Sequence, residues 1–143
     1  MSNQNDELIR EIHKAASSGL EAIETILPKI NGSQLRREAE RQGSHYKHLI
    51  TRSEEMLQKA QALPEKSPVL QKAVMWGAIQ MNTLADASSE HIAEILINGS
   101  NMGIVEMTKQ MNRLPDADAG AKRLAEEFLR GEQRHIEELK SYL

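Results

Sequence analysis

The stretch Gly131-Glu132-Gln133-Arg134-His135-Ile136 places a carboxylate and an imidazole three residues apart. On a helix each residue turns by about 100°, so Glu132 and His135 lie side by side on one face. Apolar residues recur around this pair at helical spacing and predict that this face is buried: Leu124, Phe128, Ile136, Leu139 and Leu143. Each polar group buried without a partner costs on the order of 2–7 kcal/mol, so both need partners. A metal ion is one such partner, and helix bundles use Glu-x-x-His pairs as its ligands.

The composition fits a single domain over residues 1–143 with an aliphatic core. Hydrophobic residues make up 39% of the chain, yet it contains only one Phe, one Trp and two Tyr. Charged residues make up 27%, with both signs interspersed and a net charge of −3. A nucleic-acid-binding protein would show a basic patch or stripe, so no nucleic-acid partner is expected.

Other classes of protein are disfavoured by what the sequence lacks. No run of about 18 apolar residues occurs, so we expect no membrane-spanning helix. The polar, acidic residues at positions 1–7 do not resemble a signal peptide, and a cytoplasmic location is the default expectation. The chain has no cysteine, which excludes disulfides, thiol catalysis and cysteine-ligated metal sites.

Periodic apolar residues predict four long helices and one shorter helix. Proline, glycine and small polar residues mark the turns, at Pro28, at Asn31-Gly32, from Pro64 to Pro68 and at Leu114-Pro115. The expected helices span residues 6–27, 33–63, 69–84, 89–113 and 119–142. No segment alternates with a period of two, so no strand is expected. The sequence therefore predicts an all-α fold with one long hairpin on each side of the segment 64–88.

Two of the long helices carry a polar residue near the centre of an apolar face. Gln42 is central on the face of helix 33–63, with His45 beside it, and Glu106 is central on that of helix 89–113. Met102 lies on the same predicted buried face as Glu106, and so do Gly99 and Gly103, whose spacing of four residues lets a neighbouring helix approach closely there. Helix 69–84 is apolar around much of its circumference, which predicts either a crossover packed along the bundle or half of a homodimer contact.

These elements resemble the ferritin-like superfamily, which includes ferritins, rubrerythrins and many small bacterial helix bundles. The resemblance implies an up-and-down four-helix bundle of two helical hairpins, joined by a crossover that here contains the shorter helix. The family pattern is one Glu on each of the first and third helices and Glu-x-x-His on each of the second and fourth. Those six side chains hold two iron or manganese ions. Glu132 and His135 match the pair on the last helix, and Glu106 corresponds to the third-helix carboxylate.

The chain departs from that pattern on its first two helices. Helix 33–63 reads Gln42-x-x-His45, with an amide in place of the carboxylate, and the inward positions of helix 6–27 carry no carboxylate. Two carboxylates remain where the family has four, too few to offset the charge of a di-iron centre. The resemblance then implies a single ion held by Glu106, Glu132 and His135, with Gln42 or His45 as a weaker fourth ligand.

Two functions remain open at this stage, and neither includes an assigned reaction. The first is a ferritin-like bundle with a reduced metal site for one iron or manganese ion. The second is a metal-free structural or protein-interaction bundle that has lost the di-iron site. In the second case Glu132 and His135 form a buried carboxylate–imidazolium pair, extended by Gln42 and Tyr46. Metal content separates the two hypotheses.

Overall fold

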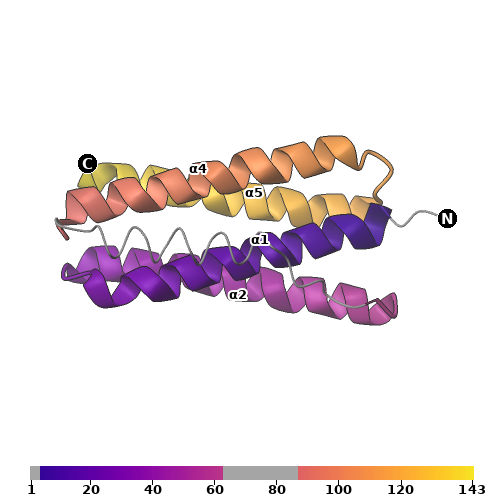
Figure 1. Cartoon of the computed structure of the whole chain (residues 1–143), viewed down its shortest axis with the longest axis horizontal. Coiled ribbons are helices and arrows are strands. Elements are labelled where there is room, and N and C mark those ends of the chain that lie inside the picture. Colours follow the sequence, from indigo (N-terminus) through magenta and orange to yellow (C-terminus); the bar gives the residue numbers. More distant parts are fainter. Residues whose placement is uncertain (1–3, 63–86) are drawn as a thin grey trace.

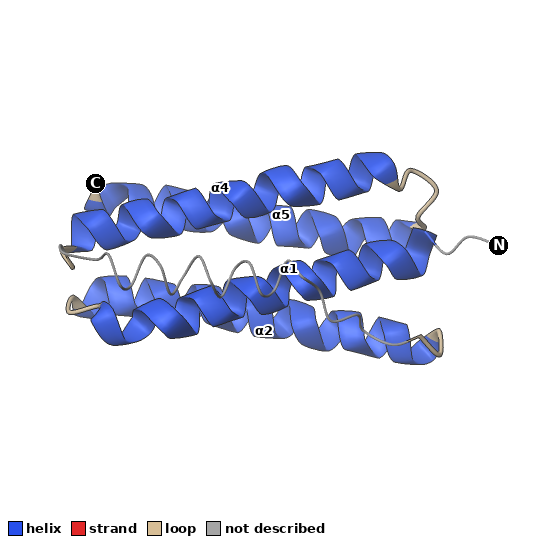
Figure 2. Ribbon diagram, in the orientation of Figure 1, coloured by secondary structure: helices blue, strands red, loops and turns tan. Residues whose placement is uncertain are grey.

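The computed structural model describes residues 4–62 and 87–143. Within these ranges the chain forms helices and no strand, which confirms the predicted all-α class (Figure 2). The elements are α1 (Gln4–Ile26), η1 (Leu27–Lys29), α2 (Ser33–Lys59), α4 (Ser89–Arg113), α5 (Ala119–Leu139) and η2 (Lys140–Tyr142). Among these described helices, none combines the length and the apolar character needed to cross a membrane.

The four long helices pack as two antiparallel pairs, α1 with α2 and α4 with α5 (Figure 1). Helix α5 also packs against α1 and α2, which joins the two pairs around one core. The end of α2 and the start of α4 lie at opposite ends of the bundle (Figure 1). The connection that the sequence predicts to cross the bundle, including the expected helix 69–84, falls outside the described residues.

Most helix boundaries agree with the predicted ones, but α2 ends earlier than expected. Its last residue is Lys59 rather than residue 63, because Gln61 adopts a left-handed conformation with φ of 57°. The amide of Ala62 then donates to the Leu57 carbonyl at 2.8 Å, and the amide of Gln61 donates to Gln58 at 3.0 Å. This pair of bonds satisfies the last carbonyls of the helix before Pro64 is reached.

Helix α4 is rotated relative to the face that the sequence predicted. Met102 was placed on the buried stripe but is 59% exposed, and Glu106 is also exposed. The buried face runs instead through Leu96, Ser100 and Met107. Ser100 lies on the buried face but is polar, whereas Met102 is apolar. The hydrophobic pattern therefore favoured Met102 as the buried residue. The terminal Leu143, also expected in the core, is 61% exposed.

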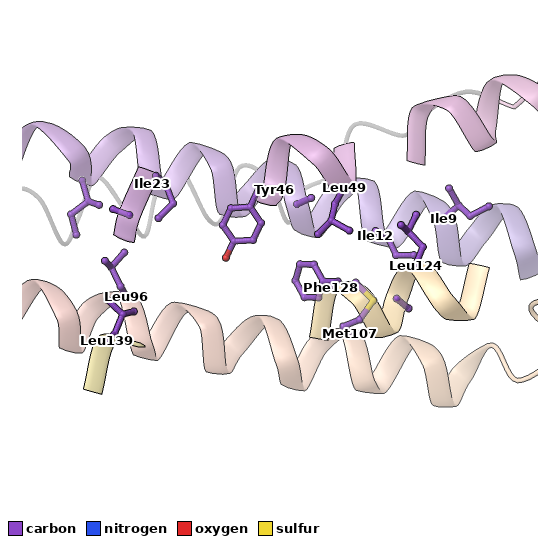
Figure 3. Packing of buried hydrophobic residues seen from close by; sticks show 14 of the residues in the cluster. Ile9, Ile12, Ile23, Tyr46, Leu49, Leu96, Met107, Leu124, Phe128 and Leu139 are labelled. Atoms are coloured by element: carbon purple, nitrogen blue, oxygen red, sulfur yellow. The ribbon is translucent and has the colours of Figure 1, made fainter. Parts of the chain in front are cut away.

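Aliphatic side chains from all four long helices fill the core. Figure 3 shows residues of α1 and α2 facing those of α4 and α5, with the Tyr46 ring pointing inward beside this apolar packing. The largest fully buried apolar side chains are Phe128, Leu8, Ile12, Ile23, Ile30, Leu35, Leu49, Leu57, Ile92, Met107 and Leu139. Seven polar or charged residues are buried with them: Ser18, Glu38, Gln42, Ser53, Ser100, Glu132 and His135.

Candidate functional site

A chain of hydrogen bonds crosses the core and connects three helices. The Gln42 amide on α2 donates to the Tyr46 hydroxyl and to Ser100 Oγ on α4, both at 2.9 Å. The Tyr46 hydroxyl donates to Glu132 Oε1 on α5 at 2.6 Å. Gln42, Tyr46 and Glu132 therefore meet in the core, as in the metal-free alternative, but the carboxylate–imidazolium pair of Glu132 with His135 that this alternative contained is not among the described ion pairs. Ser100 was not predicted, because α4 was assigned the wrong face.

Glu132 is held in this network as a neutral acid at neutral pH. Its side chain is almost fully buried, and burial raises its pKa from 4.5 to about 8, although hydrogen bonds from Tyr46 and Gln42 act in the opposite direction. The pKa of Tyr46 is raised well above its usual value, first by burial and then by the nearby Glu132. Both groups consequently keep their protons, and the network carries no net charge at pH 7.

The Glu132 carboxyl group packs against Gly103, which has no side chain to displace it. A Cβ at position 103 would lie 2.8 Å from Glu132 Oε2 and 3.3 Å from Cζ of Phe128. The close approach predicted for this part of α4 is therefore found at Gly103. A Cβ at Gly99 would have no neighbour within 4 Å among residues 4–62 and 87–143, so the packing of these residues does not require that glycine.

His135 faces a different partner from Glu132, although the two are separated by one helical turn. Its Nδ1 lies 3.7 Å from Oε1 of Glu38 on α2, within ion-pair distance but too far for a hydrogen bond. Both side chains are buried, and neither ring nitrogen of His135 has a hydrogen-bond partner in the ranges that the structure describes. The Glu-x-x-His pair therefore divides its contacts, with Glu132 bonded to Tyr46 and His135 next to Glu38.

His45 completes a cluster of three ionisable side chains between α2 and α5. Its ring centroid lies 6.0 Å from that of His135. Its Nε2 is buried without a hydrogen-bond partner and occupies the space that a Cβ on Gly131 would fill. We call Glu38, His45 and His135 the histidine cluster. The histidine cluster requires glycine at position 131, because any larger residue there would displace the His45 ring.

Burial shifts all three members of the histidine cluster toward their uncharged forms. The pKa of His135 falls from 6.5 to about 4, mainly because of burial and secondly because of the nearby His45. Burial also lowers the pKa of His45 and raises the pKa of Glu38. Neutral imidazoles are the form that binds metal ions. The two rings are therefore ready to act as ligands at neutral pH without losing a proton.

The five predicted metal ligands are not all brought together. Gln42, His45, Glu132 and His135 line the interior between α2 and α5, whereas Glu106 is exposed on α4 and is removed from the site. In the ranges 4–62 and 87–143, no three acidic, histidine or cysteine side chains converge closely enough to hold an ion as they stand. Glu106, the third-helix member of the predicted set, is therefore exposed, whereas Glu132 and His135 are buried.

Glu38 is the site residue that the sequence analysis missed. It lies four residues before Gln42 and seven before His45, which places all three on one side of α2. That spacing was a usable signal, but a glutamate flanking an apolar stripe is usually solvated. Here only 3% of Glu38 is exposed, since the end of α5 covers it.

Comparison with models of known protein families gives no match, and comparisons with curated proteins and with solved structures give none either.

Proposed function

We propose that the protein is a ferritin-like helical bundle that binds one divalent transition-metal ion at the histidine cluster. His135 and Glu38 are the primary ligands, and His45 moves toward them to become the third. This proposal keeps the single-ion site expected from the sequence and replaces Glu106 by Glu38. Gln42 and Glu132 then support the site through the neighbouring hydrogen-bond network instead of contacting the ion.

The observation that supports this proposal is the set of buried atoms without hydrogen-bond partners. Among the residues that the structure describes, both ring nitrogens of His135 and Nε2 of His45 are in this state, and Oε2 of Glu38 has only its ion pair with Nε of Arg41 at 3.3 Å. Buried polar atoms in folded proteins nearly always have a partner, so each such atom calls for a water molecule or an ion. Three unpartnered ring nitrogens beside the buried Glu38 carboxyl, all of ligand type, favour an ion.

The distance between the two primary ligands is compatible with a shared ion. Two donor atoms bound tetrahedrally at about 2.0–2.1 Å from one ion are about 3.4 Å apart. Nδ1 of His135 and Oε1 of Glu38 lie 3.7 Å apart. A shift of a few tenths of an ångström, well within side-chain freedom, brings them to that separation. His45 requires a larger rotation, away from Gly131.

The donor set determines which ions are suitable and which chemistry is excluded. Two imidazoles and one carboxylate, with open positions for water, suit iron(II), manganese(II) or zinc(II). A di-iron centre needs about four carboxylates, and the described core supplies two, Glu38 and Glu132. We therefore propose a site for one ion and assign no reaction to it.

A metal-free bundle is the alternative function, and one observation favours it. Glu132, the carboxylate of the Glu-x-x-His pair, is fully engaged in a neutral network that links α2 with α5. Specifying how the helices pair is a sufficient role for such a network, as it is for buried polar groups in some coiled coils. The protein would then act as a structural or interaction module.

Metal analysis of matched variants tests the proposal. Protein purified without chelators is loaded in turn with iron(II), manganese(II) and zinc(II), desalted, and analysed for bound metal. We expect about one ion per chain in the wild type and in Glu106→Gln, which is the control for the excluded ligand. His135→Gln and Glu38→Gln should each lose the ion while retaining a cooperative thermal transition.

Two results would overturn the proposal. The absence of stoichiometric metal under every loading condition would support the metal-free bundle. Retention of the ion in both His135→Gln and Glu38→Gln would show that a different site binds it. If one of these variants fails to fold, the other still gives the answer. A rise in the wild-type melting temperature on metal addition provides a third, independent readout.

A further inference from the structure

We infer that a pocket beside the histidine cluster binds a free α-amino acid with a polar side chain. The pocket lies between the first half of α2 and the end of α5 and has a volume of about 350 Å³. This is within the range of sites that bind small molecules. The inference goes beyond the proposed metal site, and its test needs no metal.

Helix α2 supplies one wall of the pocket, and this wall is rich in hydrogen-bond donors. Gln34, Arg37, Glu38 and Arg41 lie at successive helical spacings of three, one and three residues, which places them on one side of the helix. Arg37 and Arg41 are four residues apart, so their positive charges repel each other on the same face. A bound anion between the two guanidinium groups would relieve that repulsion.

The guanidinium groups are available for such an anion. Arg41 contacts Oε2 of Glu38 through Nε alone, at 3.3 Å. Its terminal nitrogens, and all nitrogens of Arg37, have no partner among the residues that the structure describes. A carboxylate matches the planar fork of a guanidinium group and forms charge-assisted hydrogen bonds with it. The two arginines therefore fit the carboxylate end of a ligand.

The opposite wall supplies a negative charge. Glu138, Ser141 and Tyr142 line the pocket from the end of α5 and from η2. The Glu138 carboxylate has no ion-pair partner within the described ranges, and it acts on Glu38 by repulsion. A simple anion would meet this negative charge at close range. A ligand that carries an ammonium group as well as an anionic group would form an ion pair with the Glu138 carboxylate.

Charge and size together define the ligand class. Two guanidinium groups on one wall and a free carboxylate on the other complement a zwitterion, which is the state of an α-amino acid at neutral pH. The volume leaves space beyond the α-carbon, and Gln34, Ser141 and Tyr142 present polar atoms to it. A polar side chain is therefore expected. Glu38 connects the pocket floor to His135, so a ligand bound here lies next to the histidine cluster.

Titration with three matched probes, followed by amide chemical shifts, tests this inference on the full chain. The probes are L-glutamine, N-acetyl-L-glutamine without the ammonium group, and L-glutaminamide without the carboxylate. We expect saturable binding of L-glutamine with shifts at residues 34–41 and 138–142. Each modified probe should bind at least about tenfold more weakly, as expected for the loss of a charged hydrogen-bonding group.

Variants show whether the named residues are responsible. Arg37→Gln and Arg41→Gln should each weaken L-glutamine binding about tenfold or more, and Glu138→Gln should reduce the preference for L-glutamine over N-acetyl-L-glutamine. Arg52→Gln is the control, since Arg52 is exposed on α2 and pairs with Glu55. Equal binding of all three probes, or no loss in the two arginine variants, would overturn the inference. Binding of inorganic phosphate in place of L-glutamine would also overturn it, by showing a site for simple anions.

Discussion

The Tyr46 hydroxyl on α2 donates a hydrogen bond of 2.6 Å to Oε1 of Glu132 on α5, inside an otherwise aliphatic core. The two residues are 86 positions apart in the sequence. Tyr46 also accepts a hydrogen bond from Gln42, which in turn reaches Ser100 on α4. This single hydroxyl therefore connects the amide and the acid that fix how the helix pairs meet.

Removal of the Tyr46 hydroxyl should destabilise the fold. In Tyr46→Phe the ring keeps its contact with Phe128, but Glu132 loses a donor and Gln42 loses an acceptor in a buried place. We expect the free energy of unfolding to fall by about 1–3 kcal/mol, the cost of leaving buried polar groups unsatisfied. Urea denaturation measures this, with Tyr142→Phe as the control. Equal stability of Tyr46→Phe and the wild type would show that the network contributes nothing.

The stability of metal-free protein should fall as the pH rises from about 6.5 to 8. The folded-state pKa of Glu132, about 8, lies above its unfolded value near 4.5, so its contribution is complete below pH 4.5 and is lost as the pH approaches 8. His135 acts in the opposite direction between about pH 4 and 6.5, because its folded-state pKa is lowered. The two effects oppose each other below pH 6.5. Above it, Glu132 lowers stability by about 1.4 kcal/mol per pH unit, and Glu38, whose pKa is also raised by burial, acts in the same direction.

Glu132→Gln isolates this effect. The variant keeps a neutral side chain of similar shape, so its stability should stay nearly constant between pH 6.5 and 8. Between pH 6.5 and 8 the wild type should therefore lose about 2 kcal/mol of unfolding free energy relative to the variant. Urea denaturation at four pH values in the presence of a chelator gives both curves. Parallel curves would show that Glu132 does not titrate in this range.

Two glycines on α4 should respond in opposite ways to alanine. Gly99→Ala should stabilise the protein by about 1 kcal/mol, because alanine favours a helix and its methyl group meets no atom within 4 Å. In Gly103→Ala the methyl group overlaps Oε2 of Glu132, which Tyr46 holds in place. A loss of about 1–3 kcal/mol is expected there. Thermal denaturation of both variants checks the pair, and a gain for Gly103→Ala would contradict the described packing.

Gly131→Ala should disrupt the histidine cluster from the α5 side. The new methyl group would occupy the position of His45 Nε2, so the ring must leave its place. We expect lower stability of the metal-free protein, because the ring loses its buried place, but no loss of zinc affinity, because the proposed ligation itself turns His45 away from Gly131. Gly120→Ala on the same helix is the control, since its closest neighbour would be 3.5 Å away. Equal thermal stability of metal-free Gly131→Ala and the metal-free wild type would contradict the described position of His45.

The sequence predicted the fold class and most of the core, because hydrophobic periodicity is a direct consequence of burial. It also predicted that Gln42, Tyr46 and Glu132 are buried together. The assignment failed where the buried face is not apolar: Ser100 replaced the expected Met102 inside, and Glu38 is covered by the end of α5. Whether such a residue is buried depends on the orientation of each helix about its own axis when the helices pack. The sequence of one helix does not determine that orientation. The dimer contact expected from helix 69–84 lies outside the described residues.

The most direct test of the account is to follow the ring nitrogens of the five histidines by NMR during a zinc titration. Zinc(II) is diamagnetic and accepts the same imidazole and carboxylate ligands. At one equivalent of zinc, the account predicts that the ring nitrogens of His45 and His135 shift, while those of His13, His48 and His91 do not. Changes restricted to these three histidines, or no change at His135, would contradict the proposed metal site.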